Sequence, residues 1–192
     1  MTLTTPEDPA GRPVTVWTLE MTAATDLRPA TRRVPDADLR EWPAAGSDPS
    51  AAEVSQAAQQ SRFFYRAVGS AWQWVDRREW SDEQWRAWVD QPTYRMLSCW
   101  VDGIAAGYVE VAQQGSNAEL AYVGLLPDFI GRGLGGWLLT AAVRTSWQMP
   151  DVDRVWVHTC SLDGPTALAN YQARGFRVQS IDTEYRRVVA GG

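Results

Sequence analysis

A cluster of glycines stands where a predicted strand is followed by a predicted helix. In the run Leu125-Leu-Pro-Asp-Phe-Ile-Gly-Arg-Gly-Leu-Gly-Gly136, glycine occupies positions 131, 133, 135 and 136. Glycine lets the backbone turn sharply and lets a ligand approach the main chain closely. Free N–H groups and the positive dipole end of the following helix attract anions. The turn therefore predicts a phosphate-binding site, well suited to a pyrophosphate.

Two common nucleotide-binding motifs do not explain this turn. Gly131, Gly133 and Gly136 have the spacing Gly-x-Gly-x-x-Gly, but that fingerprint should open the first strand–helix unit of a parallel sheet. Here a predicted antiparallel meander precedes it, and the next predicted strand, 154–159, does not end in an acidic residue. A Walker loop needs Gly-Lys-Ser/Thr, and the chain contains no lysine.

Few other side chains are of a type that could perform catalysis. Glu110 and Glu119 lie on predicted strands, and His158 lies two residues before Cys160 on another. The single histidine excludes paired-histidine catalysis and His-rich zinc sites. Cys99 and Cys160 make neither a disulfide framework nor a metal cluster. We therefore expect no metal.

The composition is typical of a soluble chain of one domain. The 192 residues are 45% hydrophobic and 21% charged, with a net charge of −5. This acidic balance excludes a basic surface for nucleic acid or an anionic membrane, and it favours solubility and a cationic small-molecule partner. No apolar run reaches the roughly 18 residues of a membrane span. Residues 1–13 lack the apolar stretch of a signal peptide, so we expect a cytoplasmic protein.

Capping and turn signals divide the chain into the elements that would position these groups. Capping boxes pair Ser50 with Glu53 and Ser81 with Gln84, and each begins a helix. Asp102-Gly103 joins two alternating runs as a hairpin. Residues 29–50 contain many prolines and predict a loop with at most one helical turn. The predicted strands are 14–21, 94–101, 105–112, 118–126, 154–159 and one or two within 176–189, and the predicted helices are 51–68, 82–90, 131–149 and 165–174.

Two segments resemble motifs of the GCN5-related N-acetyltransferase (GNAT) family. Ile130-Gly-Arg-Gly-Leu-Gly135 is similar to the family pattern Arg/Gln-x-x-Gly-x-Gly/Ala, and Tyr171-Gln-Ala-Arg-Gly-Phe176 to the downstream Tyr-x-x-x-Gly-Phe. They occur in the family's order and spacing. The resemblance implies the GNAT fold, an α/β (α+β) domain with a mixed central sheet of six to seven strands, an antiparallel meander and flanking helices. Residues 1–13 would form a loose leader, 14–93 an acceptor-side part and 94–180 the acetyl-CoA-binding core of this single domain.

The resemblance also implies acetyl-CoA as co-substrate. The pantetheine arm would follow the end of the strand before the turn, and the pyrophosphate would lie on the backbone N–H groups of the turn. Ile130 stands where the family usually has Arg or Gln, so we expect Arg132 to replace that contact, and Gly164-Pro165 occupies the region of a frequent cofactor-binding Asn. The expected cofactor-binding residues are Val123, Gly124, Leu125, Leu126, Gly131, Arg132, Gly133, Leu134, Gly135 and Gly136.

The implied reaction is direct attack of an amine on the thioester. Deprotonating an alkylammonium at pH 7 costs about 4–5 kcal/mol, so a base is needed. Glu119 has the same offset from the turn as the base glutamate of histone-acetylating members, and Glu110 on the adjacent strand is the alternative. A lone histidine on a strand is more often a packed side chain than a catalyst, and His158 is left open as a second base. Tyr171 would protonate the leaving thiolate, and strand N–H groups would stabilise the oxyanion.

Aromatic residues between 63 and 88 would cover the acceptor side. The phrase Phe-Phe-Tyr-Arg-Ala-Val-Gly-x-x-Trp-x-Trp over 63–74 is similar to acetyltransferases that inactivate aminoglycosides of the kasugamycin type at the 2′-amine. An aminoglycoside is therefore the leading acceptor. A peptide N-acetyltransferase and a degenerate acetyl-CoA-binding sensor are the alternatives, no nucleic acid or membrane partner is expected, and a homodimer is left open. The candidate acceptor-binding residues are Phe64, Trp72, Trp74, Asp76, Asp82, Tyr122 and His158.

Overall fold

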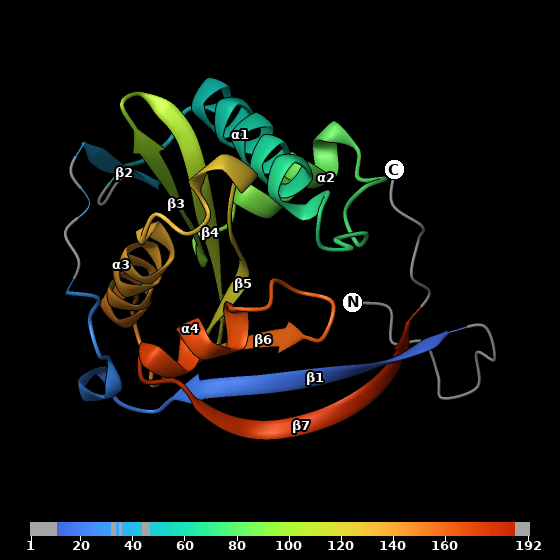
Figure 1. Cartoon of the computed structure of the whole chain (residues 1–192). Coiled ribbons are helices and arrows are strands. Elements are labelled where there is room, and N and C mark those ends of the chain that lie inside the picture. The colour runs from blue at the N-terminus through green and yellow to red at the C-terminus, as the bar shows by residue number, and fades with distance from the viewer. Residues whose placement is uncertain (1–10, 32–33, 35, 44–46, 187–192) are drawn as a thin grey trace.

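A seven-stranded sheet flanked by helices forms the described part of the chain, which in this computed structural model comprises residues 11–31, 34, 36–43 and 47–186 (Figure 1). The predicted mixed α/β fold is confirmed. The strands are β1 (Arg12–Met21), β2 (Ala37–Trp42), β3 (Tyr94–Val101), β4 (Ile104–Gln114), β5 (Asn117–Leu125), β6 (Arg154–Cys160) and β7 (Arg177–Arg186). The α helices are α1 (Ala51–Gly69), α2 (Asp82–Val89), α3 (Leu134–Gln148) and α4 (Ala167–Ala173), and the short 3-10 turns are η1 (Ala24–Asp26) and η2 (Pro127–Phe129).

The strand order β2-β3-β4-β5-β6-β1-β7 contains one parallel pair, β5 with β6. That pairing is short, because it joins only residues 117–119 to residues 154–156. Beyond Glu119 and Trp156 the two strands diverge, and Figure 1 shows them leaving each other. We call the diverging segments, 120–125 of β5 and 157–160 of β6, the β5–β6 fork. Within the described residues, it leaves one edge of β5 without a partner strand.

The sheet separates two hydrophobic clusters. Side chains alternate along a strand, so Val109 of β4 belongs to the cluster that includes Leu138 of α3, whereas Tyr108 belongs to the cluster on the opposite face. That second cluster contains Phe64 of α1 and Trp85 of α2. Figure 1 shows α3 and the α1–α2 pair on different sides of the sheet. Both faces of the meander are therefore covered.

The capping boxes and the hairpin are confirmed. The side chains of Ser50 and Ser81 each accept from a backbone N–H three residues on, and Asp102 and Gly103 both have positive φ. No described helix is long and apolar enough to cross a membrane.

Several element boundaries differ from the sequence-based expectation, and β1 begins at Arg12, inside the predicted leader 1–13. Strand β2 lies inside the predicted loop 29–50, because its exposed, polar sequence is held by backbone pairing to β3 rather than by a hydrophobic pattern. Helix α3 begins at Leu134, later than predicted, since Gly131 and Gly133 have φ of 81° and 88° and cannot be helical. Helix α4 begins at Ala167, also later than its predicted start at Pro165. Residues 177–186 form one strand, whereas residues 1–10 of the predicted leader and 187–189 lie outside the described residues.

Candidate functional site

The glycines between η2 and α3 have two different tasks. Gly131 and Gly133 supply positive φ for the turn, and Gly133 is the left-handed N-cap of α3. Gly135 and Gly136 allow α4 to approach, since a Cβ at these positions would lie 3.1 Å from the Asn170 amide and 2.6 Å from the Arg174 guanidinium. Within the described residues, no backbone N–H from 131 to 136 donates to a protein oxygen. The turn therefore presents free donors at a helix N-terminus, which fits a pyrophosphate.

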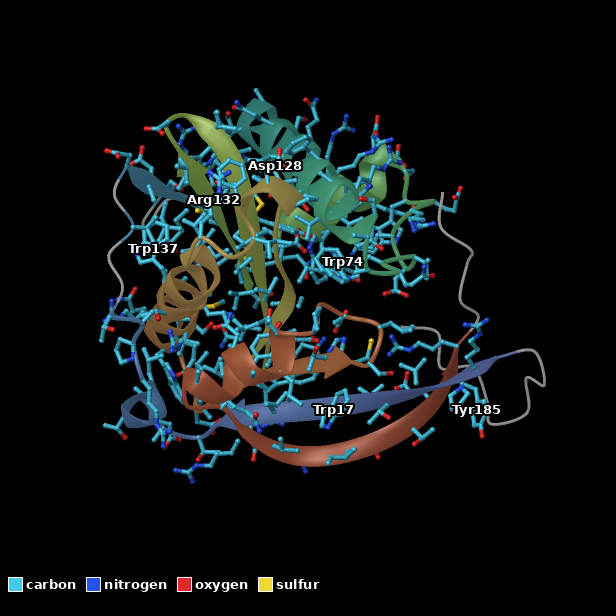
Figure 2. All side chains as sticks on the ribbon, viewed as in Figure 1. Trp17, Trp74, Asp128, Arg132, Trp137 and Tyr185 are labelled. Atoms are coloured by element: carbon cyan, nitrogen blue, oxygen red, sulfur yellow. The ribbon has the colours of Figure 1, made fainter. Side chains whose placement is uncertain are left out.

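Arg132 and Ile130 are exposed beside these donors. The side chain of Ile130 is apolar and 51% of the residue is exposed, so it offers no polar contact. The Arg132 guanidinium lies 5.1 Å from the centre of the Phe129 ring. Figure 2 shows Arg132 and Asp128 on the segment between β5 and α3, with Trp74 on the other side of β5. Arg132 is thus placed where an anion on the turn could reach it.

The unpaired edge of β5 continues from this turn. The Leu126 N–H donates to the Ala106 carbonyl at 2.9 Å, and Gly107 stands opposite Leu125 in the register. Because peptide groups alternate along an extended strand, the N–H groups of Val123 and Leu125 point away from β4, into the β5–β6 fork. The fork therefore offers backbone donors and acceptors to an extended chain such as pantetheine.

Glu119 and His158 meet where the fork begins. Ala118 and Leu120 face the α3 side, so Glu119 between them faces the α1–α2 side. His158 lies on the same face, and its Nδ1 is 3.2 Å from Oε1 of Glu119. The hydrogen bond to Glu119 raises the pKa of His158 above its usual value, although desolvation opposes it. Both side chains remain accessible, with 23% of Glu119 and 33% of His158 exposed.

Glu110 cannot act as the alternative base, because its carboxylate is enclosed. It is fully buried and accepts hydrogen bonds from Arg77 at 2.7 Å, from the Trp88 indole at 3.0 Å and from the Tyr94 hydroxyl at 3.0 Å. Ser61 donates a further hydrogen bond. These donors occupy both oxygens, so an incoming amine has no access. The structure corrects this alternative and makes Glu110 the centre of a buried polar network.

Tyr171 lies in the core below α3 with its ring edge against Phe176. Burial raises the pKa of its hydroxyl, which keeps the phenol protonated. Among the described residues its hydroxyl has no hydrogen-bond partner. The phenol is therefore protonated at neutral pH, and its raised pKa makes it a weaker acid than an exposed tyrosine.

Two of the candidate acceptor-binding residues are not placed to bind an acceptor. Phe64 is fully buried and its ring stacks on Tyr108 at 5.1 Å, so it is part of the core. Asp82 is exposed at the start of α2, where it pairs with Arg62 of α1 at 2.6 Å. Acidic side chains are favourable at the N-terminus of an α helix, so the position of Asp82 does not require a ligand to explain it. Both expectations are corrected.

The other candidates lie on one side of the fork. Asp76 of the α1–α2 loop accepts from the Tyr122 hydroxyl at 3.2 Å, and the ring of Trp74 lies 4.9 Å from that of Tyr122. Trp72 lies close to Gly164 of the β6–α4 loop, where a Cβ would be 3.5 Å from its ring. The α1–α2 loop therefore approaches the β5 arm of the fork at Tyr122 and the loop that follows the β6 arm at Gly164.

Sequence reasoning missed several charged groups around this region. Arg77, next to Asp76, is buried and holds the loop by pairing with Glu110. Arg154 pairs with Glu20 at 2.6 Å and lines a shallow pocket together with Glu119 and Trp156. Arg77 lies between Trp74 and Trp80 in sequence, and this pattern could have indicated an arginine packed among aromatic rings. The sequence around Arg154 contains no comparable signal. The α1–α2 side of the sheet around Glu119 thus carries both positive and negative side chains.

Residues 53–176 match the Acetyltransferase (GNAT) family. The mycothiol acetyltransferase of Clavibacter sepedonicus is 33% identical over 113 residues, which cover 59% of this chain and 36% of that protein, so the chain spans about a third of the length of this curated relative. A GCN5-related N-acetyltransferase from Sphaerobacter thermophilus has a TM-score of 0.61 at 19% identity, covering 93% of this chain and 53% of that one. An aminoglycoside acetyltransferase from an uncultured soil metagenomic sample has a TM-score of 0.58 at 11% identity, covering 72% and 87%. Since the family match extends over more than half of the residues, the chain belongs to the acetyltransferase (GNAT) family.

Proposed function

We propose that this chain is an acetyl-CoA-dependent N-acetyltransferase that acts on a small amine. The main observation behind the proposal is that two groups of free backbone N–H donors, on the turn and on the open edge of β5, follow one another. The N–H groups of the turn 131–136 have no acceptor among the described residues, and the open edge of β5 leads to them. GNAT proteins use acetyl-CoA as co-substrate, and a pyrophosphate followed by an extended arm has the shape of this donor track.

We assign the following roles to the residues of the site. The turn and Arg132 hold the pyrophosphate, and the N–H groups of Val123 and Leu125 are available to the arm and to the charge that develops on the thioester oxygen. Acetyl-CoA supplies the activated acetyl group. The acceptor amine loses its proton on the Glu119 side of the fork, and Tyr171 donates a proton to the departing thiolate.

The acceptor approaches from the face that carries Asp76 and Glu119. An aminoglycoside remains our first candidate, because these carboxylates suit a cationic amine and because aromatic rings line the same side. Arg154 lines a pocket with Glu119 and pairs with Glu20, and Arg186 acts on His158 and pairs with Glu184. These two cations favour an acceptor with fewer positive charges than a polycation. The acceptor of mycothiol acetyltransferases is therefore the second candidate, in keeping with the 33% identity to such a protein.

A thiol-release assay tests the proposal. Free CoA is measured with acetyl-CoA and a panel of acceptors comprising kasugamycin and other aminoglycosides, the acceptor of mycothiol acetyltransferases, a polyamine and a basic peptide. Turnover with any small amine supports the proposal, and turnover with the peptide alone supports a peptide N-acetyltransferase. Binding of acetyl-CoA with no turnover on the whole panel would support a sensor protein and contradict the enzyme assignment.

A further inference from the structure

The geometry points to His158 as the catalytic residue that takes the proton from the acceptor amine, with Glu119 as the positioning residue that holds its imidazole. This inference rests on the acetyltransferase function proposed above and assigns its proton-transfer step to named atoms.

The pairing of Glu119 with His158 determines which imidazole nitrogen is free. Oε1 of Glu119 lies 3.2 Å from Nδ1 of His158, so the Nδ1 position carries the proton that faces the carboxylate. The neutral imidazole then has its lone pair on Nε2. None of the described residues makes a hydrogen bond to Nε2, and a third of the side chain is exposed. Nε2 is therefore a base without a partner among the described residues, on a side chain that is one-third exposed at the start of the fork.

The position of the pair in the sheet supports this role. Glu119 is the last residue of β5 that pairs with β6, opposite Trp156, and His158 follows two residues later on the same face. The hydroxyl of Tyr122, with Asp76 against it, marks the same side of β5. The imidazole thus lies on the face of the sheet that also carries Glu119, next to the point where the β5–β6 pairing ends.

Three charged groups from different elements act on the imidazole. Glu119 on β5 and Asp163 in the β6–α4 loop raise the pKa of His158, and Arg186 on β7 lowers it, as does desolvation. The net effect is a pKa above the ordinary value of 6.5. A general base is most effective when its pKa lies near the working pH. The ordinary pKa of an imidazole is about two units above that of a carboxylate, so the imidazole is the stronger base.

The step balances in atoms and charge. One proton of the acceptor ammonium passes to Nε2 of His158, and the neutral amine nitrogen attacks the thioester carbonyl carbon. The new C–N bond forms, the C–S bond breaks, and the nitrogen loses a second proton while the sulfur gains one. The net products are the amide, free CoA and one proton, which the imidazolium returns to the solvent.

The chain offers an unusually direct experiment, because His158 is its only histidine. NMR of the labelled imidazole reports the tautomer and the pKa of this one group without any substitution. The same pKa is compared with the acid limb of kcat/KM against pH, using one amine that the wild-type enzyme acetylates. The variants are His158→Gln and Glu119→Gln, and Glu41→Gln on the exposed edge strand β2 is the matched control.

We expect the imidazole pKa and the acid limb to coincide in the wild-type protein, with Nδ1 protonated in the neutral form. His158→Gln should lower kcat/KM at neutral pH by about 10²–10⁴-fold and abolish that limb. Glu119→Gln should move the imidazole pKa and the limb together to lower pH, while Glu41→Gln changes neither.

Turnover that keeps its rate and acid limb in His158→Gln would overturn this inference and leave the acetyltransferase function standing. So would an imidazole pKa that is the same in Glu119→Gln as in the wild type. Absence of turnover with every amine would refute the proposed function and, with it, the assignment of His158. If a variant fails to fold, selective acylation of His158 in the wild-type protein by diethyl pyrocarbonate must still abolish turnover, and full activity after that modification would refute the assignment.

Discussion

The guanidinium of Arg77 lies 2.7 Å from the carboxylate of Glu110, and both side chains are almost completely buried. The rings of Trp80, Trp88 and Tyr122 surround the guanidinium carbon at 4.0–4.6 Å. This pair joins the α1–α2 loop to the middle of β4. It thereby determines where the neighbouring Asp76 stands relative to the fork.

Removing one partner of this pair should be strongly destabilising. In Glu110→Gln the Arg77 charge stays buried without its counter-ion, and the free energy of unfolding should fall by about 3–5 kcal/mol, as measured by urea denaturation. The double variant Arg77→Met/Glu110→Gln should recover part of that loss, because no unpaired charge remains. A loss below about 1 kcal/mol in Glu110→Gln would contradict the structural role of the pair.

Gly133→Glu should abolish the rise in Tm that acetyl-CoA produces. The added side chain places a negative charge at the left-handed N-cap of α3, where the proposed pyrophosphate meets the free N–H groups. Gly133→Asn is the matched control, since asparagine tolerates positive φ and adds no charge. It should retain most of the shift. A folded Gly133→Glu variant with an undiminished shift would remove the turn from the binding site.

The Glu119–His158 contact should stabilise the folded protein, and this stabilisation should decrease as the pH rises. Histidine in an unfolded chain titrates near 6.5, and Glu119 raises the pKa of His158 in the folded protein. The folded state therefore binds the proton more tightly, so the stabilisation is complete below about pH 6.5 and is lost as the pH rises through the folded pKa. The stability difference between wild type and Glu119→Gln, from urea unfolding at several pH values, should shrink on that rise. The same difference at every pH would argue against the pairing in solution.

Tyr171→Phe should lower kcat more than it changes KM. The substitution removes only a hydroxyl that has no partner among the described residues, so the ring and its contact with Phe176 remain. Protonation of the thiolate is a late event, and losing its donor should reduce kcat by about 10²-fold or more. Steady-state kinetics measures this, with the melting temperature as the check that the core is intact. Unchanged kcat would show that Tyr171 is only a core residue.

Asp76→Asn and Asp82→Asn should differ in their effect on a cationic acceptor. Asp76 faces the fork next to Tyr122, whereas Asp82 pairs with Arg62 on the outer surface. Asp76→Asn should raise KM and leave kcat nearly unchanged, because an ion pair holds substrate and transition state about equally. The rise should shrink in high salt. Equal effects of the two variants, or no effect of salt, would contradict an ionic role of Asp76.

The sequence alone was enough for the elements that depend on local interactions. The capping boxes at Ser50 and Ser81, the Asp102-Gly103 hairpin and the glycine turn were all predictable, because each depends on residues within a few positions of one another. The resemblance in the turn and at Tyr171 gave the family. Strand β2 was missed because its pairing partner, β3, lies more than fifty residues away.

What the site residues do was decided by the tertiary structure. Glu110 and Glu119 are both strand glutamates flanked by apolar residues in sequence, and only the packing separates them. Glu110 lies under α1 and α2, where Arg77 and other donors consume its oxygens, whereas Glu119 lies where β5 and β6 diverge and remains open to His158. A carboxylate is a base or a structural anchor according to what surrounds it, and those neighbours come from segments that only folding brings together.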